Sequence, residues 1–180
     1  MKQIKIIITG AQCSGKSSLI RELAKEFECL NETALEIFRD NDKLVLDKNN
    51  FKEFNGKLTK RQIQKETDAN NKIVFLDRSL IDQLLFCNEY KIITPNSTYE
   101  NIKSAKYTIV FFLQMLAKEL WNKTESDKPR HNTYEEGARR GERLLEIYKQ
   151  FDIPIIVIPV RSVKERAEMI KKELKARGLL

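Results

Sequence analysis

Short runs of apolar residues alternate along this chain with stretches in which apolar residues recur at helical spacing. The apolar runs predict buried strands at 4–8, 27–30, 73–76, 107–113 and 155–158. Helical spacing follows each run in turn, at 19–27, 34–38, 80–88, 144–151 and 163–174. Strands that alternate with helices predict an α/β fold, a three-layer α/β/α sandwich around a parallel sheet.

The segment 40–71 departs from this regular order because it is polar and irregular. Asn49-Asn50 and Asn55-Gly56 are turn signals, and a weakly amphipathic helix is expected from Thr59 to about Asn70. After the 73–76 strand, Ser79 is expected to cap the next helix, with Asn88 on the side that carries its leucines.

Composition indicates an ordinary soluble protein with one domain over residues 1–180. The N-terminal apolar run is too short for a signal peptide or a membrane span, so we expect a cytoplasmic protein without a membrane partner. Cys13, Cys29 and Cys87 do not have metal-ligand spacing, and His131 is the only histidine. A metal is therefore expected to be Mg²⁺, bound by oxygen atoms.

The formal net charge of +7 is compatible with an anionic partner, either a polyphosphate nucleotide or a nucleic-acid strand. The basic residues form no block or tail, and aromatic residues are not interleaved with them as in a strand-binding groove. We therefore favour a dispersed basic surface.

The segment 10–17, GAQCSGKS, fits the phosphate-binding pattern G-x-x-x-x-G-K-[ST] and lies between the first predicted strand and the first helix. In such a loop the backbone N–H groups bind phosphate oxygens, Lys16 reaches the outer phosphates and Ser17 offers a hydroxyl to Mg²⁺. ATP and Mg²⁺ are the expected ligands. The residues expected to contact the nucleotide are Gly10, Ala11, Gln12, Cys13, Ser14, Gly15, Lys16, Ser17 and Ser18.

Charged residues follow the second and third predicted strands, at the sheet edge where ligands of α/β folds gather. Asp77 suits the shell of Mg²⁺, with a helix cap as the alternative. Arg78 would bind an oxygen of the acceptor or the transferring phosphate, with a surface salt bridge as the alternative. Glu32 would accept the proton of an attacking hydroxyl or cap the helix that it precedes.

Arginines are also frequent in the polar segment 121–143, which we expect to act as a lid over the phosphates. Arg130, beside Pro129, is the best candidate to neutralise charge during transfer. Arg139, Arg140 and Arg143 are expected mainly on an exposed helix face.

Six runs occur in order along the chain: IIITGAQCSGKSSLIREL, NETALEIF, VFLDRSLIDQLLFC, DKPRHNTYEEGARR, LLEIYKQFDIPIIVIP and SVKERAEMI. Together they resemble the AAA-type ATPase-like family that includes the ribosylnicotinamide kinase domain of NadR. Asp77-Arg78 is also similar to the Asp/Glu-Arg pair of thymidylate and deoxynucleoside kinases. The resemblance implies five strands in the order 2-3-1-4-5, a lid, ATP binding at 10–17, catalysis at Asp77 and Arg78, Glu32 near the acceptor and Arg130 in the lid.

Three functions stay open at this point. The favoured one is a kinase for a nucleoside, nucleotide or similar small metabolite. The others are a kinase for 5′-hydroxyl ends of nucleic acids, and a regulatory NTPase without a second substrate. The segment 40–71 carries no substrate signature, and a homodimer is compatible with all three functions.

Overall fold

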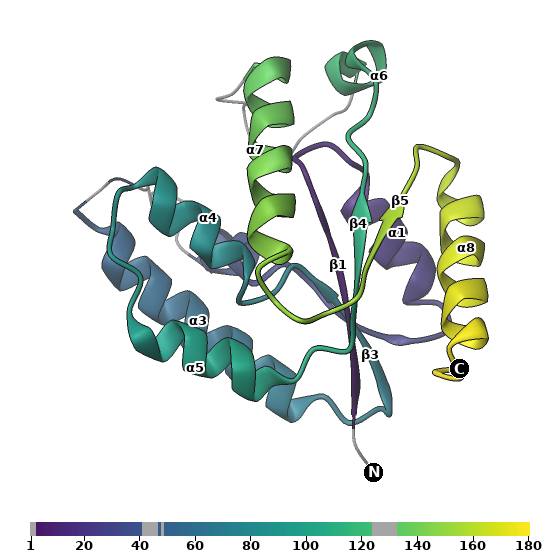
Figure 1. The fold of residues 1–180 in the computed structure, drawn as a ribbon, viewed down its shortest axis with the longest axis horizontal. Helices are drawn as coiled ribbons and strands as arrows, with labels where there is room; N and C mark the ends of the chain where they lie inside the picture. The colour runs from purple at the N-terminus through teal and green to yellow at the C-terminus, as the bar shows by residue number, and fades with distance from the viewer. Residues whose placement is uncertain (1–2, 41–46, 48, 124–132) are drawn as a thin grey trace.

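The computed structural model describes residues 3–40, 47, 49–123 and 133–180 (Figure 1). Five parallel strands form one sheet in the order β2-β3-β1-β4-β5. The predicted α/β class and strand order are therefore confirmed. The strands are β1 (Ile4–Gly10), β2 (Glu28–Leu30), β3 (Ile73–Asp77), β4 (Ile109–Leu113) and β5 (Ile155–Ile158).

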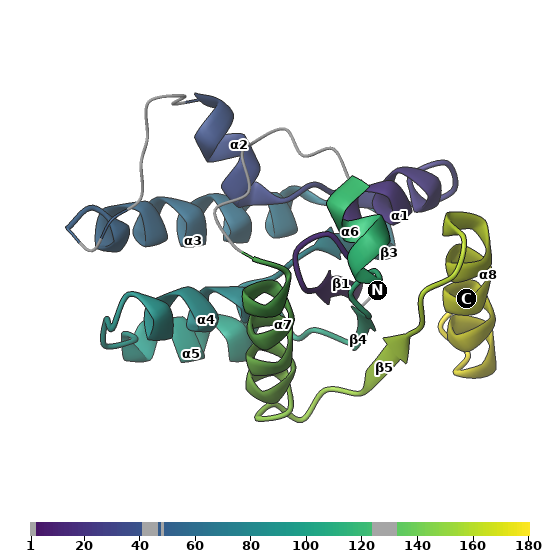
Figure 2. The same cartoon turned by 90° about the horizontal axis from the view of Figure 1, so that it is seen from above.

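Helices cover both faces of the sheet, as the views in Figures 1 and 2 show. On one face lie α1 (Lys16–Leu23) and α8 (Val163–Ala176), and on the other α4 (Asp82–Glu89), α5 (Asn96–Ala105) and α7 (Tyr134–Tyr148). Successive side chains of a strand point to opposite faces. Ile6 and Ile8 of β1 accordingly pack with α1 and α8, whereas Ile7 packs with α4 and α7.

A third apolar cluster joins α2 (Thr33–Asp40) and α3 (Phe51–Asp68) to α4. The predicted start of α3 at Thr59 is wrong, because the helix begins at Phe51 and runs through the expected turn at Asn55-Gly56. The buried residues of α3 have helical spacing: Phe51, Phe54, Leu58, Gln62 and Glu66. The last two are polar, so hydrophobic periodicity alone could not reveal the whole helix.

The predicted start of the helix after β3 is also corrected by the structure. Ser79 Oγ accepts a hydrogen bond from the Ile81 N–H at 3.1 Å, but α4 begins only at Asp82, without a side-chain cap at Ile81. Asn88 is exposed rather than inward-facing. β4 begins at Ile109 rather than at 107.

Two helices have no counterpart in the sequence-based prediction, α5 and α6 (Lys118–Lys123). α5 buries only Thr98 and Ile102, which is too few apolar positions to give a periodic signal. Over the described part of the chain, no helix has the length and apolar character needed to cross a membrane.

Candidate functional site

The loop between β1 and α1 requires glycine at both glycine positions of the pattern G-x-x-x-x-G-K-[ST]. Gly10 has φ 144°, and a Cβ there would lie 2.4 Å from the Leu113 carbonyl oxygen. Gly15 has φ 81°, and a Cβ there would lie 2.7 Å from Nη2 of Arg166. Both positions therefore exclude side chains by backbone conformation and by close approach of a neighbour.

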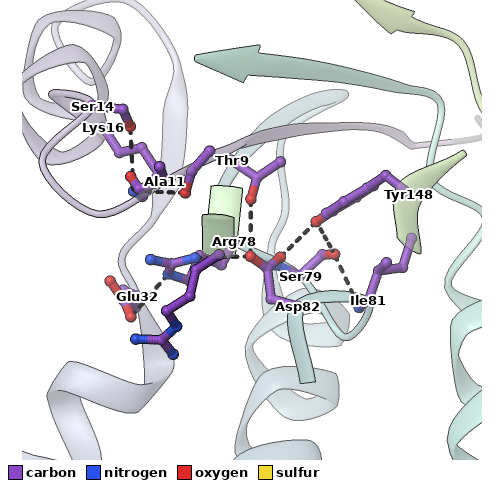
Figure 3. A network of polar contacts seen from close by, with 12 residues as sticks. Thr9, Ala11, Ser14, Lys16, Glu32, Arg78, Ser79, Ile81, Asp82 and Tyr148 are labelled. Carbon is purple, nitrogen blue, oxygen red and sulfur yellow. Dashed lines mark hydrogen bonds and ion pairs between the residues drawn. The ribbon is translucent and has the colours of Figure 1, made fainter. Parts of the chain in front are cut away.

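Lys16 is the first residue of α1, and its side chain points back into the loop. Nζ donates hydrogen bonds to the carbonyl oxygens of Ala11 at 2.7 Å and Gly10 at 3.2 Å (Figure 3). Burial is the main reason that the pKa of Lys16 falls to about 8, and the positive charge of Arg78 lowers it further. An anion in the loop would favour the charged form of this ammonium group.

The rest of the loop has the exposure that an anion site needs. Ser14 is fully buried, Gln12 and Cys13 are half-buried, and Ser17 is exposed. α1 has no side-chain cap at Gly15 and no acidic residue in its first turn. Both features favour an anion at this helix N-terminus. The residues expected to contact the nucleotide thus extend from the end of β1 at Gly10 to the first turn of α1 at Ser18, and the contacts themselves stay predictions.

Asp77 ends β3 beside the loop, paired in register with Ile8 of β1. Its side chain is buried, and Oδ1 has no hydrogen-bond donor among the described residues. Burial, together with the nearby charge of Glu32, raises the pKa of Asp77 to about 6. An unpaired carboxylate oxygen is one of the oxygen ligands that Mg²⁺ prefers.

Arg78 lies between two carboxylates (Figure 3). Its Nε is 3.1 Å from Glu32 Oε1, and its Nη1 is 2.9 Å from Asp82 Oδ1. Although burial opposes the charge, Glu32, Asp82 and Asp77 together raise the pKa of Arg78. The backbone of Arg78 has φ 69°, an uncommon conformation for a residue with a side chain. The structure therefore brings together Lys16, Glu32, Asp77 and Arg78, as the sequence predicts.

Asp82 is the residue of this site that the sequence analysis missed. Its buried carboxylate accepts hydrogen bonds from Thr9 Oγ1 at 2.8 Å, the Ser79 N–H at 3.0 Å and the Tyr148 hydroxyl at 2.5 Å (Figure 3). With Arg78 Nη1 as fourth donor, Asp82 connects β1, β3 and α7. In the sequence, Asp82 could have been found from its spacing of four residues from Arg78, because side chains at this spacing can pair within one helical turn.

A second buried polar network holds α3 against the sheet. Glu66 accepts hydrogen bonds from Gln62 at 2.9 Å, Tyr107 at 3.0 Å and Lys5 at 3.0 Å. Gln62 is in turn hydrogen-bonded to the Thr33 hydroxyl, directly after Glu32. These contacts fix the start of α2 and the polar side of α3 relative to the charged side chains around Arg78.

A cavity bordered by described residues lies elsewhere, between α2 and α3. It measures about 730 Å³, and its apolar wall includes Ile37 and Phe54. None of the lining residues is Glu32, Asp77 or Arg78. This cavity is therefore separate from the group of charged side chains around Arg78.

Only part of the predicted lid can be placed. Arg130 and His131 lie outside the described residues. Arg140 forms an ion pair with Glu89, with Nε 2.7 Å from Oε1, and Arg139 and Arg143 are exposed on α7. α7 itself reaches the phosphate-binding loop, because a Cβ at Gly141 would lie 2.8 Å from the Cβ of Ala11.

Within the described ranges, no group of three or more histidine, cysteine, aspartate or glutamate side chains could hold a metal ion by itself. A bound Mg²⁺ would therefore need ligands from outside such a cluster, as in sites that share the ion with phosphate oxygens.

Comparison with solved structures finds the same fold in several kinases. Deoxyadenosine kinase from M. mycoides with bound dATP has a TM-score of 0.65 at 20% identity, over 96% of this chain and 100% of that chain. Thymidylate kinase from Candida albicans has a TM-score of 0.60 at 15% identity, over 99% of this chain and 93% of the other. At these identities the similarity shows the fold alone.

The NadR protein in complex with NR is similar over a part of its length. Its TM-score is 0.67 at 16% identity, over 99% of this chain and 52% of that chain. Among curated proteins, none matches this chain in sequence.

A family model gives the classification that the fold alone cannot. Residues 5–166 match the model described as AAA domain. The match includes the phosphate-binding loop, Glu32, Asp77-Arg78 and the start of α8, and it spans most of the sequence. The chain therefore belongs to the AAA domain family.

Proposed function

We propose that this protein is a Mg²⁺- and ATP-dependent kinase that transfers the γ-phosphoryl group to a hydroxyl or phosphate of a nucleoside, nucleotide or similar small metabolite. The observation that carries the proposal is the position of Arg78, which pairs with Glu32 and Asp82 beside the phosphate-binding loop. Plain nucleotide binding needs the loop but not this additional group of charges. Kinases for deoxyadenosine and thymidylate share the fold, which supports the same reaction class.

At the donor end, the backbone of the loop and Lys16 would bind the phosphates of ATP. Ser17 and Asp77 would hold Mg²⁺, which supplies positive charge against the phosphate oxygens when it is bound. Lys16 Nζ already lies inside the loop, against the Gly10 and Ala11 carbonyls. Small rotations of this side chain would exchange carbonyl acceptors for phosphate oxygens.

At the acceptor end, Glu32 and Arg78 have complementary roles. The acceptor oxygen forms its bond to the γ-phosphorus while the bond from that phosphorus to the β–γ bridging oxygen breaks, and ADP leaves. Glu32 takes the proton of the attacking hydroxyl. Arg78 binds the acceptor or the transferring phosphoryl group and neutralises its charge. The 3.1 Å ion pair keeps both groups at one place before substrate binds.

The proposal predicts that Lys16→Ala and Asp77→Ala each lower phosphoryl transfer by about 100-fold or more while the fold is kept. The measurement is ADP release from ATP and Mg²⁺ with a panel of nucleosides and nucleoside monophosphates. Circular dichroism and thermal melting check the fold of each variant. Normal ATP turnover by both variants would rule out the assignment.

The same panel, with a 5′-hydroxyl oligonucleotide beside it, distinguishes the alternative functions. A regulatory NTPase would show at most slow hydrolysis that no acceptor stimulates. A nucleic-acid kinase would respond to a 5′-hydroxyl oligonucleotide and not to free nucleosides.

A further inference from the structure

Arg166, near the start of α8, is a buried cation that the transfer site described above does not use. The residue is 4% exposed. No carboxylate among the described residues forms an ion pair with it, and its buried Nε has no hydrogen-bond partner there. Burial lowers the pKa of Arg166. Because burying an unpaired charge is costly, a guanidinium group at this position needs a compensating interaction.

The contact that Arg166 does make is with the phosphate-binding loop. Its Nη1 donates a hydrogen bond to the Ser14 carbonyl oxygen at 2.7 Å. Its Nη2 would lie 2.7 Å from a Cβ at Gly15. α8 runs beside α1 on one face of the sheet (Figure 1). The guanidinium group therefore lies directly against the outer side of the Ser14–Gly15 peptide.

This contact fixes the orientation of one peptide group in the loop. The Ser14 carbonyl and the Gly15 N–H belong to the same trans peptide, so they point in opposite directions. Arg166 holds the carbonyl toward α8. The Gly15 N–H must then point away from the Arg166 guanidinium group.

We propose that Arg166 is a positioning residue for the phosphate chain of a bound nucleotide. It holds the Ser14–Gly15 peptide with its N–H toward the phosphates and places a positive charge behind the loop. The ligand class is any nucleotide with at least a diphosphate, ADP as well as ATP. This inference rests on the proposed nucleotide binding, but it does not depend on the identity of the acceptor.

The first test measures ADP affinity by isothermal titration calorimetry. Arg166→Met keeps the length of the side chain and removes its charge and donors, so we expect ADP to bind about 10-fold more weakly or worse. Arg166→Lys keeps the charge and is expected to recover part of the affinity. The matched control is Arg177→Met at the far end of α8, where the arginine pairs with Glu173 on the surface at 2.7 Å.

The second test measures the chemical shift of the Gly15 amide by NMR. The chain has six glycines, so a glycine-labelled ¹⁵N spectrum resolves Gly15. A hydrogen bond to phosphate should move the Gly15 amide proton downfield when ADP binds to the wild-type protein and to Arg177→Met. In Arg166→Met this shift should be lost, although the protein remains folded by circular dichroism. A purely structural role of Arg166 would leave the shift in place.

The outcomes separate this inference from the proposed function. If the wild-type protein does not bind ADP, the proposed function fails first, and Arg166 has no nucleotide to position. If the wild type binds ADP, unchanged affinity in Arg166→Met overturns the inference, as does weaker binding with the Gly15 shift retained. If neither Arg166→Met nor Arg166→Lys folds, Arg166 serves the fold and the inference is wrong.

Discussion

Asp82 determines the conformation of Arg78 more directly than any other single residue. Its carboxylate accepts four hydrogen bonds, one of them from Arg78 Nη1 at 2.9 Å, and only 3% of the residue is exposed. Glu32 holds the other side of the same guanidinium group. Removing Asp82 would therefore leave Arg78 with one carboxylate partner and free to turn toward Glu32.

We expect Asp82→Asn to lower the free energy of unfolding by about 3 kcal/mol, because an NH2 donor replaces one of the two accepting oxygens and the buried Arg78 charge loses an ionised partner. Urea unfolding measures this change. The control is Asp152→Asn, the same substitution at an exposed position, for which we expect a change within about 0.5 kcal/mol. Equal unfolding midpoints for the two variants would show that the Asp82 network does not hold Arg78.

Lys16 gives a prediction for pH. Its pKa in the free protein is about 8, so at pH 8.5 most molecules carry a neutral amine. Bound phosphates stabilise the ammonium form and raise this pKa. ADP binding at pH 8.5 should therefore take up protons, and the contribution of Lys16 should be much smaller at pH 7, where most Lys16 side chains are already charged. Asp77, with a pKa of about 6, is ionised at pH 8.5 and contributes little there.

Calorimetry in two buffers of different ionisation enthalpy measures this proton uptake. The observed binding enthalpy should depend on the buffer at pH 8.5. Buffer-independent enthalpies at pH 8.5 would show that Lys16 is charged in the free protein at that pH.

At the scale of the elements, the contact between α7 and the loop determines how closely the phosphates can be enclosed. Gly141 is the residue that permits this contact, since a Cβ there would lie 2.8 Å from the Cβ of Ala11. Gly56 in α3 is the opposite case, because a Cβ there would have no neighbour within 4 Å. The two helical glycines form a natural pair for comparison.

We expect Gly141→Ala to push α7 away from the loop and weaken ADP binding, measured as a smaller ADP-induced rise in melting temperature. Gly56→Ala should instead raise the free energy of unfolding by about 0.5–1 kcal/mol, because alanine favours the helix, and leave ADP binding unchanged. A destabilised Gly56→Ala protein would indicate that Asn55-Gly56 forms a turn in solution. Unchanged ADP binding by Gly141→Ala would exclude the contact with α7.

The elements also show how far the sequence could predict this structure. All five strands and the loop followed from the short apolar runs and from the pattern at 10–17. α3 was only half predicted, since Gln62 and Glu66 occupy inward positions that the pattern treats as polar surface. Asp82 was missed for a related reason: a lone buried acid at the first position of a helix has no periodic signal. Contacts between distant segments, such as Arg166 with Ser14, depend on the tertiary fold.

At the scale of the whole molecule, the net charge of +7 is spread out rather than gathered. Many basic side chains pair with acidic ones in different parts of the fold, among them Lys5 with Glu66, Lys65 with Glu36, Arg140 with Glu89 and Lys171 with Glu26. Such pairing favours the dispersed basic surface over a track for a nucleic-acid strand. We therefore expect no phosphoryl transfer to a 5′-hydroxyl oligonucleotide, even at low salt; transfer there, and not to free nucleosides, would reverse this preference.

The most direct test of the central claim follows the γ-phosphoryl group itself. ATP labelled in this group is incubated with Mg²⁺, the protein and each acceptor of the nucleoside and nucleotide panel, and the label is traced by chromatography. The account predicts label in a phosphorylated acceptor, formed together with an equal amount of ADP and lost in folded Lys16→Ala. Label recovered only as inorganic phosphate, at a rate that no acceptor changes, would contradict it.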